Sequence, residues 1–174
     1  MAEDTIVPSF TQVYEDNFLT VYRVAYGITQ NSEVAEDICQ EVFIRYTQYE
    51  KKVYKYAKYW LIRVSRNLAI NIAKRKQKEH MMYSHMFKNS KMVDPAVDKS
   101  ILKEENKDML IAAISKLPIR YKEVIIMKQY ADLPYRDIAK ALHISESNVK
   151  VRMYRARVLL KKLLKTARYE HENI

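Results

Sequence analysis

The sequence is poor in the residues that interrupt helices or cross-link a chain. Its 174 residues include one glycine, one cysteine and four prolines. The single cysteine, Cys39, excludes a disulfide framework and a cysteine-based metal site, and it suits a reducing compartment. Scarce glycine and proline, together with apolar residues that repeat with a period near 3.6, predict an all-α protein.

Targeting and cofactor signals are also missing. Residues 1–8 lack the basic and apolar regions of a signal peptide. No apolar run approaches the ~18–20 residues of a membrane span. There is no glycine-rich phosphate loop, and His80 and His85 are too poorly spaced to share one helix face as metal ligands. We therefore expect a cytoplasmic protein of one or two small domains with no metal and no other cofactor.

Charge is unevenly distributed along the chain. The 31 basic and 21 acidic residues give a net charge of +10. Residues 1–50 have a net charge of −7, whereas residues 51–80 have +9 and residues 121–174 have +6. The two basic blocks suit a polyanion such as nucleic acid, and the acidic block suits a basic protein surface or solvent.

A short turn divides the segment 134–164. We expect a helix over 135–142 and, after the turn, a second helix from Glu146 to about Leu164 with Ser145 as its N-cap. The second helix has one apolar stripe and a basic opposite face. The stripe consists of Val149, Met153, Ala156, Leu160 and Leu163. This pattern predicts a helix-turn-helix that places its second helix in a DNA major groove; a helical hairpin with a solvated basic face is the alternative.

Three more helices and a loop are expected before the turn. Apolar spacing predicts helices over 10–29 and 33–49, with Ser32 as the cap of the second. Residues 49–57, rich in tyrosine and lysine, break the period and are expected to form a loop. A helix is expected to resume over 59–76. Its inward side should contain Trp60, Val64, Leu68 and Ile72, together with Leu61 and Ile70.

Aromatic, basic and amide side chains alternate through residues 49–76. Rings stack on unpaired bases with roughly 1–3 kcal/mol per base, and cations follow phosphates, so this mixture suits single-stranded nucleic acid. The alternative is a packed aromatic cluster with lysines that reach solvent. One side of the predicted helix 33–49 contains Asp37, Gln40 and Glu41. These side chains are expected to face either a partner or solvent.

A change in composition divides the chain. Residues 78–105 are rich in lysine, methionine, histidine, serine and aspartate and show weak periodicity. We interpret them as a linker between a domain at 1–77 and a second domain at 106–174.

Three stretches resemble, in order and spacing, the bacterial extracytoplasmic-function (ECF, group IV) RNA polymerase sigma factors. They are AEDICQEVFIRY (35–46), YWLIRVSRNLAIN (59–71) and residues 117–163. Members of that family keep a −10 domain and a −35 domain joined by a linker. The resemblance implies a subunit, not an enzyme, that binds core RNA polymerase and directs promoter recognition, −10 melting and transcription initiation.

The resemblance also implies roles for individual residues. Core polymerase would be bound through Asp37, Gln40 and Glu41, which match the positions that dock on the β′ clamp helices. The −10 strand, with a base flipped into the segment 49–57, would be bound by Tyr54, Tyr56, Tyr59, Trp60, Arg63, Arg66, Asn67 and Asn71. The −35 duplex would be bound by Ser147, Lys150, Val151, Arg152, Tyr154 and Arg155.

Three positions depart from the family pattern. Asn71 stands where many members have aspartate, which bears on −10 preference. His143 stands in the turn where glycine is common, although histidine tolerates a left-handed conformation better than most residues. Pro134 replaces a frequent serine cap, and proline is acceptable in a first helical turn.

The resemblance implies several partners. They are the β′ and β subunits of core polymerase, promoter DNA, and an anti-sigma factor of the kind that often holds family members at the membrane. Insertion of this chain itself into a membrane is not expected.

Two other functions fit part of the sequence. A stand-alone helix-turn-helix regulator would use residues 117–163 but not the second basic block, and a dimer on a palindromic site would favour it. A helical adaptor that binds only protein would lack the steep loss of affinity with salt that marks a DNA-binding protein.

Overall fold

The computed structural model describes residues 8–86 and 103–172 of the chain. Every regular element in these two ranges is helical, so the all-α prediction is confirmed. The helices are α1 (Phe10–Thr29), α2 (Ser32–Val53), η1 (Tyr54–Tyr56, a 3₁₀ turn), α3 (Ala57–Met86), α4 (Lys103–Ser115), α5 (Ile119–Gln129), α6 (Tyr135–Leu142) and α7 (Glu146–Glu172).

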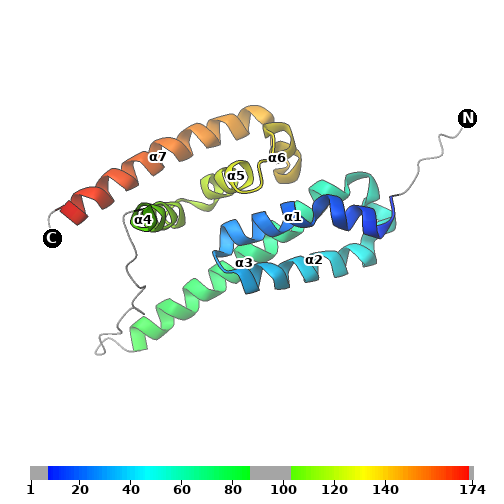
Figure 1. The fold of residues 1–174 in the computed structure, drawn as a ribbon, viewed down its shortest axis with the longest axis horizontal. Coiled ribbons are helices and arrows are strands. Elements are labelled where there is room, and N and C mark those ends of the chain that lie inside the picture. Colours follow the sequence, from blue (N-terminus) through cyan, green and yellow to red (C-terminus); the bar gives the residue numbers. More distant parts are fainter. Residues whose placement is uncertain (1–7, 87–102, 173–174) are drawn as a thin grey trace, which may run out of the picture.

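Helices α1, α2 and α3 pack on one another and form the N-terminal bundle (Figure 1). The start and end of α1 agree with the prediction, because Ser9 caps its first turn and Gln30 ends it with a left-handed φ of 52°. The cap of α2 was predicted one residue too late. Asn31 Oδ1 accepts the backbone N–H of Val34 at 2.8 Å, so Asn31 takes the role expected of Ser32.

The buried stripe of α3 lies beside the predicted one. Leu61 and Ile70 are buried as predicted, whereas the other predicted inward residues, 60, 64, 68 and 72, are only half-buried. Ser65 and Ala69, which were not predicted to face inward, are fully buried. Ser65 and Ala69 are small, so the α1 backbone can approach α3 closely, and Ser65 Oγ donates to the carbonyl of Val21 at 3.0 Å. Apolar periodicity could not reveal this stripe because serine is polar.

The segment predicted to be a loop, residues 49–57, is almost entirely helical. Helix α2 continues to Val53, the turn η1 follows at once, and α3 begins at Ala57. No glycine or proline occurs between Gly27 and Pro95, so nothing in the segment prevents helix formation. The loop prediction was therefore wrong.

Helix α3 also extends further than predicted. It runs to Met86, so the first nine residues of the predicted linker are helical, and α4 begins before the linker was expected to end. Residues 87–102 of that linker lie outside the described residues. Helix α7 likewise continues beyond the expected end at Leu164, to Glu172.

Helices α4 to α7 form the C-terminal bundle, which contains the predicted helix-turn-helix. The turn between α6 and α7 uses His143 in the left-handed conformation, with φ 53° and ψ 46°. Ser145 Oγ accepts the N–H of Asn148 at 3.1 Å and caps α7 as predicted. Val149, Met153 and Ala156 are buried, and the last two residues of the predicted stripe are half-buried.

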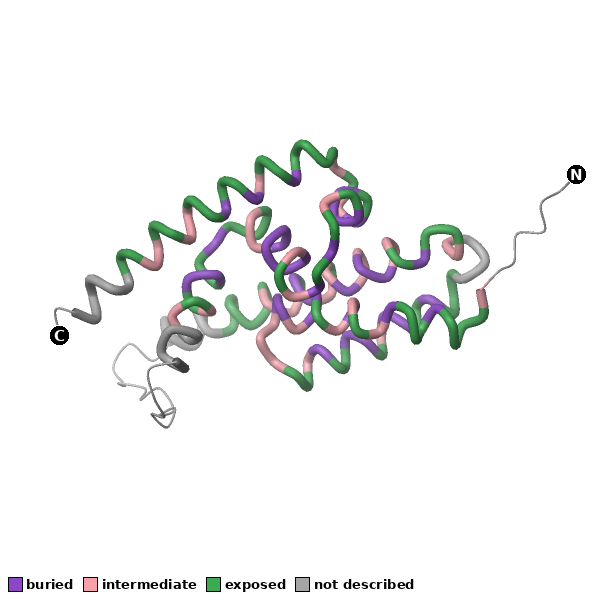
Figure 2. Tube along the Cα trace, turned by 45° about the horizontal axis from the view of Figure 1, so that its top comes forward, coloured by how far each residue is buried: buried purple, intermediate pink, exposed green. Residues whose placement is uncertain are grey.

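The two bundles lie side by side, an arrangement that we call the closed arrangement (Figure 1). Helix α5 contacts α1 and α6 contacts α3, so one hydrophobic core runs through both bundles. Figure 2 shows that α7 keeps exposed positions along its length, whereas α5 is largely buried. The C-terminal bundle therefore covers one face of α3 and leaves the outer face of α7 open.

The left-handed turn residue yields a stability prediction. We expect His143→Gly to raise the free energy of unfolding by about 0.5–1 kcal/mol, because glycine adopts positive φ without a steric penalty. His143→Ala should lower it, since alanine keeps the penalty and lacks histidine's tolerance. The exposed imidazole is lost in both variants, so urea denaturation followed by circular dichroism isolates the backbone effect. Equal free energies of unfolding for the two variants would contradict a steric cost of the left-handed conformation at position 143.

Candidate nucleic-acid interface

The acidic residues predicted to contact polymerase lie on the outer side of α2. Asp37 and Gln40 are exposed, and the half-buried Glu41 accepts a hydrogen bond from Arg45 Nε at 2.6 Å. Ile44 belongs to the same helix face and is 55 % exposed. Because the sequence reasoning assigned Ile44 to no surface, it missed an apolar side chain that gives this patch a contact point beyond charge.

The aromatic residues near η1 divide into packed and open rings. Trp60 packs against Tyr46 and Tyr49, with ring centroids 6.2 and 6.1 Å away, and Tyr46 is fully buried. Tyr56 is 66 % exposed, and Tyr54 is half-buried beside Lys55. The packed-cluster alternative therefore holds for Trp60 and its neighbours, whereas the exposed ring of Tyr56 leaves the nucleic-acid interpretation a prediction.

A cavity of about 440 Å³ lies beside these rings. Its N-terminal wall includes the rings of Tyr56, Tyr59 and Trp60, and its other wall is formed by Lys140 and His143 of the helix-turn-helix. Rings and cations around one hollow are the chemistry that holds an unpaired base and its phosphate. In the closed arrangement, however, the C-terminal bundle shares this space.

Three residues predicted for the −10 strand bind the C-terminal bundle instead of facing solvent. Tyr59 Oη donates to Asp137 Oδ1 at 3.1 Å. Arg63 Nε donates to the carbonyl of Ala141 at 3.2 Å, and burial lowers the pKa of this guanidinium. Arg66, the third residue, binds the carboxylate of Glu123 in α5.

That carboxylate is Glu123, whose side chain is 3 % exposed. Arg66 donates to its Oε2 from Nε at 2.8 Å and also from a terminal nitrogen. Arg152 of α7 donates to its Oε1 at 3.0 Å. Glu123 thus joins a residue predicted to bind the −10 strand to one predicted to bind the −35 duplex. A buried carboxylate needs such partners, since an unpaired buried charge is strongly destabilising.

Asp137 is a second buried carboxylate at the junction of the bundles. Lys58 of α3 donates to its Oδ2 at 2.7 Å, and Tyr59 binds the other oxygen. Burial by itself raises the pKa of Asp137. The hydrogen bond and charge of Lys58, then the Tyr59 hydroxyl and the charge of Arg136, outweigh that effect, so the pKa lies below its ordinary value of 3.8.

Two predicted −10 residues further along α3 stay accessible. Asn67 and Asn71 are exposed and line a smaller cavity of about 270 Å³, together with Lys74. The structure therefore splits the predicted −10 set into a covered group on the α6 side and an open group further along α3.

The outer face of α7 presents most of the predicted −35 residues. Ser147, Lys150 and Arg155 are exposed, Tyr154 is 70 % exposed, and Val151 is also open to solvent. Arg152 points elsewhere: its side chain binds Asn148 and Glu123. Five of the six predicted residues therefore share one open face, and the sixth helps to tie the bundles together.

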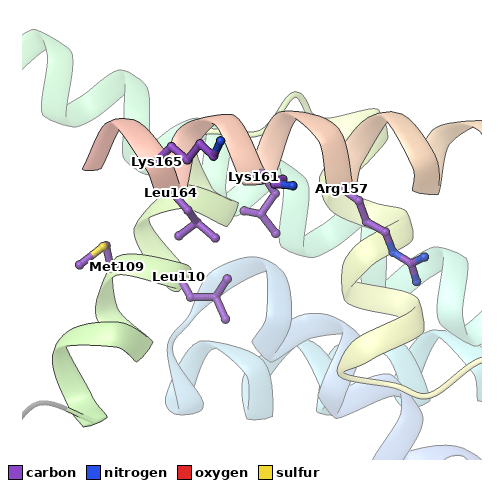
Figure 3. A pocket seen from close by; sticks show the side chains of 7 residues that line it. Met109, Leu110, Arg157, Lys161, Leu164 and Lys165 are labelled. Carbon is purple, nitrogen blue, oxygen red and sulfur yellow. The ribbon is translucent and has the colours of Figure 1, made fainter. Parts of the chain in front are cut away.

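A groove between α4 and α7 was not anticipated from the sequence. It has a volume of about 540 Å³ and combines apolar side chains with basic ones (Figure 3). Met109 and Leu110 face it from α4, and Leu164, Lys161 and Lys165 face it from α7. Four of the five α7 residues that line it lie within the predicted helix, so what the sequence did not show was that α4 packs beside them.

Several other expectations concern groups without a binding role. Cys39 is buried, and burial, followed by the charge of Glu36, raises the pKa of its thiol to about 12, so it is a core thiol. Within residues 8–86 and 103–172, histidine, cysteine and acidic side chains do not gather in groups that could hold a metal ion. The helices of this same part of the chain include none long and apolar enough to cross a membrane.

Two segments of the chain match known sequence families. Residues 13–79 match Sigma-70 region 2, and residues 107–160 match Sigma-70, region 4. The chain is 29 % identical over 153 residues to the ECF RNA polymerase sigma factor SigM of Bacillus subtilis, covering 87 % of this chain and 93 % of that protein. It is 29 % identical over 167 residues to SigW of the same organism, covering 88 % and 86 %.

Two solved structures share the fold. One is the sigma factor RpoE in complex with the anti-sigma factor NepR from Bartonella quintana, with 22 % identity, a TM-score of 0.62 and coverage of 90 % of this chain and 96 % of that one. The other is CnrH in complex with the cytosolic domain of CnrY, with 16 % identity, a TM-score of 0.64 and coverage of 90 % and 88 %.

The surroundings of Asp137 predict a pH dependence. Because its pKa is lowered in the folded protein, the stability that its charge contributes is fully present above pH 3.8 and is lost as the pH falls through the lowered value. Asp137→Asn should therefore lower the free energy of unfolding by about 1–3 kcal/mol at neutral pH. The difference from the wild type should shrink below pH 3.8, as measured by urea denaturation across pH.

Asp132 provides the matched control. It is an exposed aspartate that pairs with Lys128 on the surface at 3.0 Å, and surface ion pairs contribute little. Asp132→Asn should change the free energy of unfolding by less than about 0.5 kcal/mol. An effect of Asp137→Asn as small as that of the control, or one that does not depend on pH, would contradict the role assigned to Asp137.

Proposed function

This chain belongs to the ECF sigma factors of the sigma-70 family, which direct promoter-specific transcription, and we propose the contacts through which it does so. It binds core RNA polymerase through α2 and promoter DNA through α3 and α7. One observation supports this most directly. The chain combines two separate basic surfaces with an exposed acidic patch, and a protein that binds only DNA has no use for the patch.

The contact with polymerase lies on the exposed face of α2. Asp37, Gln40 and Glu41 meet the β′ clamp helices, and the exposed Ile44 adds an apolar contact on the same face. Complementary charges raise the rate at which the two proteins associate and set the orientation in which they meet. An aliphatic side chain that becomes buried in the contact adds affinity. The groove between α4 and α7 is free for a second contact with the enzyme.

The −10 strand lies on α3 and on the rings near η1. Tyr56, Tyr59 and Trp60 accept an unpaired base, while the basic and amide residues of α3 bind the sugar-phosphate backbone. Unpairing and unstacking a base costs a few kcal/mol, and stacking with hydrogen bonds in a pocket offsets that cost. Melting in this scheme uses binding energy and needs no nucleotide cofactor or catalytic group in the sigma factor.

The −35 element is bound as a duplex by α7. The N-terminal residues of the second helix of a helix-turn-helix reach base edges in the major groove, and lysine and arginine contact phosphates. Ser147, Lys150, Val151, Tyr154 and Arg155 form this surface. Val151 and Tyr154 add apolar contacts of the kind that recognise a thymine methyl group.

We place this protein in the cytoplasm, where polymerase and DNA are found, with an anti-sigma factor as a regulatory partner. The two solved relatives were each determined with a bound partner, named an anti-sigma factor in the case of RpoE. The domain limits 1–77 and 106–174 remain part of the proposal. A stand-alone regulator would use only the C-terminal bundle, and the family match over residues 13–79 disfavours it.

A transcription assay tests the function. Purified protein is added to bacterial core polymerase on a library of upstream DNA, and start sites are mapped. We expect specific starts that share a pair of upstream elements and disappear when the protein is omitted. Duplex binding without any starts, with a core enzyme known to accept ECF sigma factors, would refute the sigma function and favour the stand-alone regulator.

The −35 surface yields a separate prediction. Lys150→Ala and Arg155→Ala should each weaken binding of the −35 duplex by about 1 kcal/mol or more and reduce its salt dependence, because each removes a phosphate or base contact. Fluorescence anisotropy over a salt series measures both effects. Arg23→Ala removes one charge from an exposed site on α1 and should change neither. Equal losses for all three variants would indicate a nonspecific charge effect.

A further inference from the structure

The cavity of about 440 Å³ between the start of α3 and the helix-turn-helix has the lining of a small-molecule site. Its volume lies within the range of about 300–1,000 Å³ that is usual for pockets that hold one small ligand. We propose that it binds a free purine nucleotide, with the base on the rings of the N-terminal bundle and the phosphate at the basic groups around α6. Such a ligand binds the chain without polymerase or promoter DNA, so this site does not depend on the proposed function.

The base side of the cavity is aromatic. The ring of Tyr56 is largely exposed and can lie flat on a ligand without leaving a packed core. Trp60 is half-buried and packs on other rings with only part of its surface, while Val53 adds an aliphatic contact. Bases stack on such rings, and a two-ring purine covers more of this surface than a one-ring pyrimidine does.

The phosphate side contains basic groups without acidic partners. Lys140 Nζ lies 5.0 Å from the centre of the Tyr59 ring and 3.4 Å from its hydroxyl oxygen. Within the part of the chain that the structure describes, neither Lys140 nor His143 forms a salt bridge. Arg63 donates to the carbonyl of Ala141 at 3.2 Å, which holds its guanidinium beside the cavity. Several basic groups around one hollow suit a phosphate, which offers several acceptor oxygens.

The charge around the cavity also disfavours a cationic ligand. Among the described residues, no acidic side chain lines it. Asp137 lies close by, since it binds the hydroxyl of Tyr59, but its charge is paired with Lys58 at 2.7 Å. The field inside the cavity therefore favours an anion over an amine.

His143 keeps its side chain at a conformational cost. It adopts a φ of 53°, where glycine would avoid the steric penalty of a Cβ. Residues that persist in such conformations are concentrated at binding and catalytic sites, where the side chain has a use. The imidazole lines the cavity and forms no hydrogen bond within the described residues. A bound phosphate gives this side chain a partner.

Packing outside the cavity holds its two walls in place. Gly27 of α1 lies directly against α5, because a Cβ at this position would lie only 2.5 Å from Cγ2 of the fully buried Ile126. Arg66 of α3 donates to Glu123 of α5 at 2.8 Å and adds a polar contact. The walls therefore meet before a ligand enters, and a preformed site loses little affinity to ordering.

Trp60 makes the test direct, because it lines the cavity and is the only tryptophan of the chain. Its emission is followed as guanosine monophosphate is added to the full-length protein, with excitation at the red edge of the tryptophan band, where the nucleotide does not absorb. We expect a saturable change. Guanosine without its phosphate, and inorganic phosphate without a base, should each bind at least about tenfold more weakly, since each loses one side of the site. Cytidine monophosphate should bind more weakly than guanosine monophosphate.

Variants locate the ligand within the cavity. Lys140→Ala and His143→Gly should each raise the Kd at least about fivefold, because each removes a phosphate contact. Both positions are exposed, and glycine suits the turn, so the fold is retained. Tyr56→Ala should weaken binding by a similar factor, whereas Tyr56→Phe keeps the ring and should bind like the wild type. Lys116→Ala removes an exposed positive charge elsewhere and should change nothing.

Three results would overturn the nucleotide site: no saturable change at millimolar nucleotide, binding of guanosine as tight as that of its monophosphate, or equally tight binding of inorganic phosphate. Wild-type affinity in Lys140→Ala or in His143→Gly would overturn it as well. The ligand would then lie on the N-terminal rings alone, as we propose for an unpaired base of the −10 strand. The titrations contain no polymerase and no promoter, so their failure leaves the transcription assay unaffected, and the reverse also holds.

Discussion

A buried carboxylate must be paired, and the pairing of Glu123 determines how the helices of this protein meet. Its two oxygens accept hydrogen bonds from Arg66 of α3 and Arg152 of α7, so α5 lies between the two helices that we propose to bind the −10 strand and the −35 duplex. Removing one partner from such a pair typically costs about 3–5 kcal/mol, because a charge is left buried alone. In the closed arrangement both arginines, which the sequence predicted to bind DNA, are therefore engaged by Glu123.

The sequence was most informative where structure is decided locally. Apolar spacing and caps predicted the bounds of α1, the turn of the helix-turn-helix and the cap at Ser145, since each depends on residues within one or two helical turns. Local signals failed at residues 49–57, where a high density of tyrosine and lysine suggested a loop although no residue there breaks a helix. They failed again in α3, where the buried line includes the polar Ser65.

The long-range contacts could not have been read from the pattern. Arg66 and Glu123 are 57 positions apart, and the sequence shows only that each is charged and lies on a helix. Family resemblance assigned Arg66 to DNA and gave Glu123 no role. The structure shows the contact of Arg66 with a carboxylate, and the contact with DNA remains a proposal, although a guanidinium has the chemistry to bind either a carboxylate or a phosphate. The sequence does not show which of these two groups Arg66 binds.

Gly27 is a locally frustrated position. In an isolated helix alanine would be better there by about 1 kcal/mol, so α1 on its own would be more stable with the residue that the closed protein cannot accommodate. Helix α1 alone would therefore be more stable with alanine at position 27, whereas the packing of α1 on α5 requires glycine there. A search for more stable versions of the N-terminal bundle alone would therefore select Gly27→Ala, a substitution whose methyl group would collide with Ile126 where the two bundles meet.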